Sequence, residues 1–173
     1  MKYTKYALLR RAYALLENTT PLYSDCGMLC GGACCKDDSV SSEMKGGMSL
    51  LPYEDVLIGG CEGFRIEDTE DGKILFCQGR CERIFRPFMC RIFPYYASIN
   101  PETDKITLRI DPRSVNVCPI ATKKYHTRHS VYFHRNAKRA VRLLMRDEDF
   151  RNELMKTSSF CDGLYEFYST LVK

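Results

Sequence analysis

Residues 26–35 read Cys-Gly-Met-Leu-Cys-Gly-Gly-Ala-Cys-Cys, which places four cysteines and three glycines within ten positions. A gap of three residues lets a tight turn direct two sulfurs at one ion, and glycine supplies the left-handed backbone that such turns need. Adjacent cysteines project in different directions in most conformations, so Cys34 and Cys35 suit two metal ions rather than one. Because such a loop buries little apolar surface, we expect its fold to depend on a bound metal.

The remaining cysteines extend this pattern, since nine of the ten lie between positions 26 and 118. Cys77-Gln-Gly-Arg-Cys81 repeats the three-residue gap around a glycine, whereas Cys61, Cys90 and Cys118 stand singly. Packing as a small hydrophobic residue is the alternative for each cysteine. For Cys77 both interpretations stay open, and packing is our interpretation of Cys161. The predicted metal ligands are Cys26, Cys30, Cys34, Cys35, Cys61, Cys81, Cys90 and Cys118, with Cys77 as an additional candidate.

The N-terminal residues bear on the compartment and therefore on the state of the thiols. Lys5, Arg10 and Arg11 interrupt the apolar residues there, so no uncharged stretch is long enough for the core of a signal peptide. The sequence also has no run of about 20 apolar residues. We therefore expect a cytoplasmic protein without a membrane span, where reducing conditions favour metal or redox chemistry over disulfides.

Hydrophobic periodicity predicts helices at both ends of the chain and a short sheet between them. Helices are expected at 2–18, at 50–57 with Ser49 as its cap, at 121–145, and from near Asp147 toward the C-terminus. Strands are expected at 73–77, after the Asp71-Gly72 turn, and at 95–99 and 105–110, which would form a hairpin. The predicted class is α+β, with a small irregular cysteine-rich core, a short antiparallel hairpin and framing helices. Residues 1–120 would form the cysteine-cluster domain, with the helical segment 121–173 packed on it.

The C-terminal segment is basic, because residues 121–173 hold eleven Lys and Arg against six Asp and Glu. Nucleic-acid binding by this helix is one interpretation. An amphipathic helix that packs Val131, Ala137, Val141 and Leu144 inward and leaves its charges in water is the favoured one. Surface or packing roles are favoured for His126, His129 and His134, whose offsets do not match a helical metal site.

Residues 81–94 read Cys-Glu-Arg-Ile-Phe-Arg-Pro-Phe-Met-Cys-Arg-Ile-Phe-Pro. Arg86 and Arg91 would offset the net charge of −2 of a tetrathiolate zinc site or an oxidised four-iron cluster, and would donate hydrogen bonds to sulfur. The alternative is that Arg83, Arg86 and Arg91 are solvated residues on a loop.

These motifs resemble a bacterial cysteine-cluster family described as zinc- or iron-chelating proteins, which includes the flagellin lysine N-methylases. The family's cysteine run ending in Cys-Cys resembles residues 26–35, and its Cys-x-Phe-type element resembles 61–64. Its third element, Cys-x-Ile-Tyr-x-x-Arg-Pro-x-x-Cys-Arg-x-Phe-Pro, resembles residues 81–94. Cys118 matches its late cysteine. Both gaps in the first run are one residue longer than in the family, Cys81 is one residue closer to Arg-Pro, Phe85 replaces a tyrosine, and Cys77 is extra.

The resemblance implies a bound zinc ion or a 4Fe-4S cluster, in a structural or redox role. All-thiolate sites suit both metals, so the cysteine spacing leaves the choice open. A protein-lysine N-methylase that uses S-adenosylmethionine is the alternative that family membership suggests. The sequence has no obvious glycine-rich nucleotide loop, and its Cys-x3-Cys-x3-Cys run differs from the Cys-x3-Cys-x2-Cys spacing of radical S-adenosylmethionine enzymes.

Overall fold

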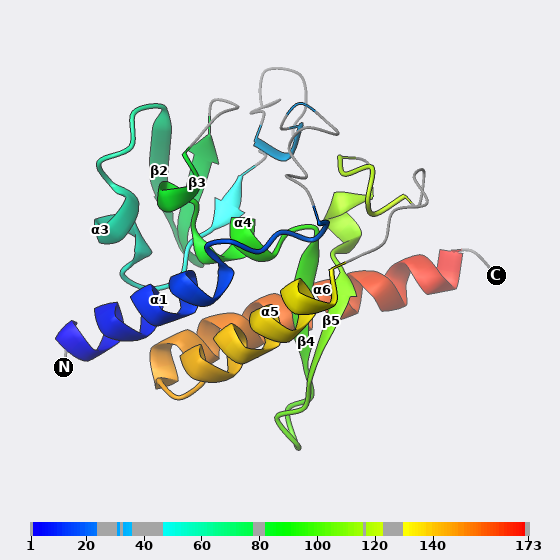
Figure 1. Cartoon of the computed structure of the whole chain (residues 1–173). Helices are drawn as coiled ribbons and strands as arrows, with labels where there is room; N and C mark the ends of the chain where they lie inside the picture. Colours follow the sequence, from blue (N-terminus) through cyan, green and yellow to red (C-terminus); the bar gives the residue numbers. More distant parts are fainter. Residues whose placement is uncertain are drawn as a thin grey trace.

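The computed structural model describes residues 2–23, 31, 33–35, 47–77, 82–115, 117–122 and 130–171. Within these ranges the protein has the predicted α+β class, with helices and two small antiparallel sheets (Figure 1). The elements in chain order are α1 (Lys2–Leu16), η1 (Ala33–Cys35), β1 (Met48–Ser49), α3 (Glu54–Ile58), β2 (Phe64–Thr69), β3 (Gly72–Cys77), η2 (Arg83–Phe85), α4 (Phe88–Ile92), β4 (Tyr95–Ile99), β5 (Ile106–Ile110), η3 (Pro112–Ser114), α5 (Val131–Leu144) and α6 (Glu148–Leu171).

The first sheet has the strand order β1-β3-β2, with both pairs antiparallel. β3 confirms the strand predicted after Asp71-Gly72, while its partners β1 and β2 were not predicted. Gly47 leads into β1 with φ 136°, and a Cβ atom there would lie 2.6 Å from Cγ2 of Ile74. Only glycine accepts both the positive φ and this close approach, so this residue sets the chain against β3.

The predicted hairpin is confirmed as β4 and β5, which pair from Tyr95 opposite Ile110 to Ile99 opposite Ile106. Its turn is held by Asn100, whose Oδ1 accepts hydrogen bonds from the backbone N–H groups of Glu102 and Thr103. This is the local bonding that favours Asn in turns. Ile106 is buried while Thr107 is exposed, which agrees with the predicted alternation.

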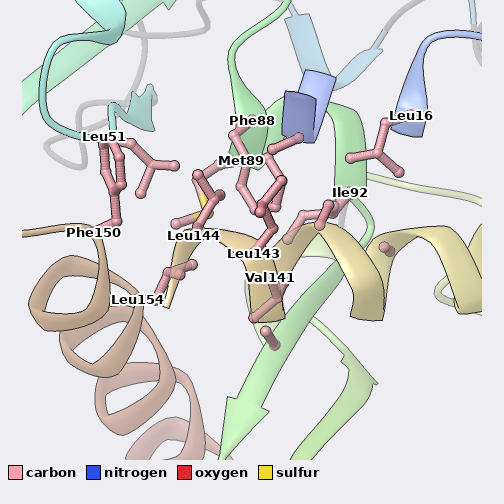
Figure 2. Close-up of a cluster of buried hydrophobic side chains, with 14 of the residues drawn as sticks. Leu16, Leu51, Phe88, Met89, Ile92, Val141, Leu143, Leu144, Phe150 and Leu154 are labelled. Carbon is pink, nitrogen blue, oxygen red and sulfur yellow. The ribbon is translucent and has the colours of Figure 1, made fainter. Parts of the chain in front are cut away.

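One apolar cluster joins both ends of the chain. α1 packs on α5, and α6 packs on β4 (Figure 1). Figure 2 shows labelled side chains of α4 and α5 grouped together, with Leu51 and Phe150 of α6 beside one another at the edge of the group. The helix predicted at 2–18 is confirmed as α1, which ends at Leu16 and directs Leu9 and Ala12 into this cluster. Burial of this surface is the main source of stability that the described residues offer.

Two predicted helix starts were wrong. The helix expected from residue 121 begins at Val131 as α5, because the Ser130 hydroxyl accepts from the Phe133 N–H and caps it. Ala137, Val141 and Leu144 are buried as expected, whereas Val131 is 71% exposed. Ser49, expected as a helix cap, lies in β1, and the short helix begins later at Glu54, as α3.

The final helix, predicted from near Asp147, is confirmed as α6. It buries Cys161 completely, as predicted. Among the described helices, none has both the length and the apolar composition that crossing a bilayer requires.

Candidate metal centre

The predicted ligands fall into two groups according to what the structure describes. Cys26, Cys30 and Cys81 lie outside the described residues, as does the side chain of Cys35, although its backbone completes η1. The described thiols are the exposed Cys34, the half-buried Cys61, Cys77 and Cys90, and the buried Cys118. The geometry of the candidate centre therefore rests on these five residues and on the segments that lead to the others.

Cys61 and Cys77 lie at the same end of the β2–β3 hairpin. Cys77 closes β3 opposite Phe64, the first residue of β2. The Phe64 N–H donates to the Cys61 carbonyl at 3.4 Å, and this bond turns the chain from Cys61 into β2. Cross-strand neighbours have Cβ atoms about 5 Å apart. The hairpin therefore brings the two cysteine-bearing backbones together from positions 16 residues apart in the sequence.

Cys118 is 8% exposed and shares a small apolar cluster with Leu22 and Ile120, against which Phe93 packs. Its N–H donates to the Ser114 carbonyl at 2.7 Å. Burial, followed by the negative charge of an ionised Cys118, raises the pKa of Tyr95 to about 12. Leu22 precedes Cys26 by four residues, so this cluster fixes the point at which the chain enters the first cysteine run.

Cys90 lies in α4, between the core residues Met89 and Ile92. Cys90 lies near Tyr13 of α1. The pKa of the Tyr13 phenol is raised mainly by burial and by Glu54, and the negative charge of an ionised Cys90 adds to this rise. α4 also packs on α1 and β1. These contacts place Cys90 at a junction of elements from three parts of the chain.

Arg83 and Arg91 hold backbone carbonyls, a role that the sequence did not suggest. Arg83 donates to the carbonyls of Leu16, Glu17 and Thr19, at the C-terminal end of α1. A cation at this end of a helix satisfies its terminal carbonyls and complements its dipole. The segment after Cys81 is thereby bound to the segment that leads toward Cys26.

Arg91 is 4% exposed, so the interpretation of a solvated arginine is wrong for this residue. Its Nε donates to the Arg86 carbonyl at 2.7 Å, and its Nη2 donates to the carbonyls of Arg83 and Ile84 at 2.8 and 2.9 Å. The guanidinium also lies 4.2 Å from the centre of the Tyr13 ring. Arg91 therefore fixes the η2 turn between Cys81 and Cys90, while the half-buried Arg86 supplies one of the carbonyls it holds.

Glu54 is a buried acidic residue near the candidate centre that the sequence analysis did not single out. The sequence shows it only as an acidic residue in the first turn of a short helix. It is 0% exposed, and its carboxylate accepts from Tyr13 Oη at 2.5 Å, Phe88 N at 2.6 Å and Leu51 N at 2.7 Å. Burial raises its pKa to about 7, against the opposing effect of these hydrogen bonds. The side chain of Glu54 thus joins α3 to α1 and α4.

Among the described residues, no group of three or more His, Cys, Asp or Glu side chains is arranged to hold a metal ion. His134 packs edge-on against Tyr95, with ring centres 4.7 Å apart, while His126 and His129 lie outside the described residues. Comparisons with protein-family models, curated proteins and solved structures find no match to this chain.

Proposed function

We propose that this protein binds zinc or a 4Fe-4S cluster through cysteine thiolates, in a structural or redox role. The proposal rests on one observation. Chain segments that carry cysteines, or lie next to them in the sequence, pack against one another although the cysteines are spread over positions 26–118. Thiolates are the ligands that both metals accept in all-sulfur sites. We also propose that the resemblance to the zinc- or iron-chelating cysteine-cluster family reflects the same kind of site.

One meeting point supports the proposal near the end of α1. The carbonyls of residues 16, 17 and 19 accept from Arg83, two residues after Cys81. A few residues further on, Leu22 contacts Cys118 in their shared cluster. Phe93, which packs on the same cluster, follows Cys90 by three residues. The chain entering the first cysteine run is thus held beside the segments of three later cysteines.

A second meeting point lies at the other end of that run. The chain that returns from it passes Gly47, which is packed against β3 beside Phe76. Phe76 precedes Cys77, and Cys77 shares its end of the hairpin with Cys61. Both ends of the first cysteine run therefore reach other cysteine-bearing segments, which supports two four-thiolate sites, or one cluster and a zinc, built from its four thiols and four or five later ones.

The charges around Cys90 favour thiolates. A four-thiolate site around Zn²⁺ carries a net charge of −2, and positive groups nearby stabilise it. Arg83, Arg86 and Arg91 come from η2 and α4 on either side of Cys90. We include Arg86 and Arg91 in the proposal as the residues that offset the charge of the site.

Elemental analysis of protein purified without oxygen tests the proposal. We expect bound zinc, or iron with broad absorption in the visible blue, and we expect Cys34→Ser and Cys90→Ser to lose metal. Cys161→Ala is the matched control, because this thiol is fully buried in α6 and is not among the proposed ligands. Far-UV circular dichroism checks that α1, α5 and α6 stay folded in each variant. Full metal content in both serine variants would refute the proposal, and a colourless protein with zinc alone would refute the cluster version.

A further inference from the structure

A hollow of about 550 Å³ lies between α1 and α5. Four arginines surround it, and its floor is apolar. The arginines are Arg11, Arg139, Arg142 and Arg146, and the floor includes Leu15 and Leu143. We call this feature the arginine groove. Its volume is in the range of pockets that bind small molecules.

Helix geometry explains why the arginines converge. Arg139, Arg142 and Arg146 follow one another at spacings of three and four, which lines them up on one face of α5 and its C-terminal turn. The opposite face carries Ala140, Val141 and Leu144 into the core. α1 packs alongside and contributes Arg11 from its own exposed face. Two helices thus direct cations at one hollow.

The four cations have no carboxylate partner. Within the described residues, none of these arginine side chains forms an ion pair or a hydrogen bond, whereas Arg109 and Arg151 each bind a carboxylate. The acidic residues just after the groove, Asp147 and Asp149, both bind Lys5 instead. Like charges at helical spacing repel one another. The groove therefore presents unneutralised positive charge that an anion would relieve.

The helix dipole weakens this charge without cancelling it. The C-terminal end of α5, at Leu144, contributes about half a negative charge beside four full positive ones. The net field of the groove stays strongly positive. Because guanidinium groups bind phosphate in a planar, two-pronged arrangement, arginine suits phosphate better than it suits a simple halide.

We propose that the arginine groove binds a small organic anion with two or more phosphate groups, of the nucleoside diphosphate class. Its phosphates would lie among the four guanidiniums, and its apolar part would lie on Leu15 and Leu143. One phosphate would leave most of the four positive charges unpaired, so the charge count favours a diphosphate or triphosphate. The groove contains no cysteine, so this inference stands independently of the proposed metal centre.

Calorimetry with ADP, in magnesium-free buffer at physiological ionic strength, tests the proposal on the chain of 173 residues. We expect ADP to bind, tripolyphosphate to bind more weakly because it makes no contact with the apolar floor, and adenosine to give no signal. Arg142→Gln and Arg11→Gln should each weaken ADP binding by about tenfold, which corresponds to about 1.4 kcal/mol. Glutamine keeps high helix propensity, so both variants should fold.

Arg10→Gln is the matched control, because Arg10 is an exposed arginine of the same helix that does not line the groove. Its ADP affinity should change less than twofold. If Arg10→Gln and Arg11→Gln weakened ADP binding equally, the effect would come from the overall charge of the helix, and the proposed site would be refuted. Absence of ADP binding would overturn it as well. A single-stranded oligonucleotide that binds better than ADP at equal phosphate concentration would replace the proposal with nucleic-acid binding.

Discussion

The helical half of the molecule and its cysteine end are held together differently. The helical half, made of α1, β4, β5, α5 and α6, shares one large apolar cluster. The cysteine end, made of residues 17–23, 82–87 and 117–122, has a cluster of three buried residues, together with arginines that bind backbone carbonyls. Apolar burial therefore holds the helical half together, whereas the cysteine end relies on polar contacts and, in our proposal, on metal.

The largest expected effect breaks the helical half. Phe133 is fully buried in α5, with its ring centre 5.7 Å from that of Tyr95. Phe133→Ala should lower the free energy of unfolding by about 3–5 kcal/mol, through lost burial and a cavity. Chemical denaturation followed by circular dichroism measures this loss. The neighbouring Tyr132→Ala, at a residue 60% exposed, should change it by less than about 1 kcal/mol. Equal losses in the two variants would contradict the described core.

A smaller effect tests the cysteine end. Arg83→Met removes the charged donor from three carbonyls at the end of α1, and we expect a loss of about 1–2 kcal/mol. Hydrogen exchange should accelerate in residues 17–23 and 82–87 and stay unchanged in α5 and α6. Arg10→Met, on the exposed side of α1, is the control and should leave both regions unchanged. Faster exchange throughout the chain after Arg83→Met would show that the two regions are not energetically separate.

A pH-dependent effect concerns Glu54, where the two regions meet. Its pKa is raised from 4.5 to about 7 in the fold, so the folded protein keeps this proton at pH values where the unfolded chain has lost it. Stability from this group is therefore complete below pH 4.5 and is lost as the pH rises through about 7. Glu54→Gln should remove this fall while lowering stability overall, since an amide cannot accept all three hydrogen bonds. Unfolding curves from pH 5 to 8 test it, and an unchanged slope in the variant would contradict the assignment.

Local patterns predicted the elements whose causes are local. The β4–β5 hairpin follows from alternation and an Asn turn, and α6 and the burial of Cys161 follow from apolar spacing. The start of α5 was missed because the weak apolar pattern before it outweighed the cap signal of Ser130. β2 was missed because its half-buried Phe64 and Ile66 pack on β3 and on the small cluster around Ile58, which the sequence pattern of β2 itself does not contain.

Metal binding by the cysteines stays a prediction from their density in the sequence. The roles of Glu54 and Arg91 could not be predicted, because they depend on partners that no local pattern contains. Tyr13 and Phe88, which donate to Glu54, are 41 and 34 positions away from it. From the sequence alone Arg91 is expected on the surface, because the carbonyls of Arg83 and Ile84 that accept its hydrogen bonds come close only once the η2 turn has formed. Such contacts exist only after the chain has packed.

The anchoring of Leu22 at Cys118 and of Gly47 at β3 has an entropic consequence for the first cysteine run. Bringing together the ends of a chain segment of about 25 residues costs roughly 3 kcal/mol of entropy. The folding of the surrounding residues supplies this free energy. A site that combines thiolates of the first run with thiolates of later segments would therefore bind its ion without that cost, which corresponds to about a hundredfold in affinity.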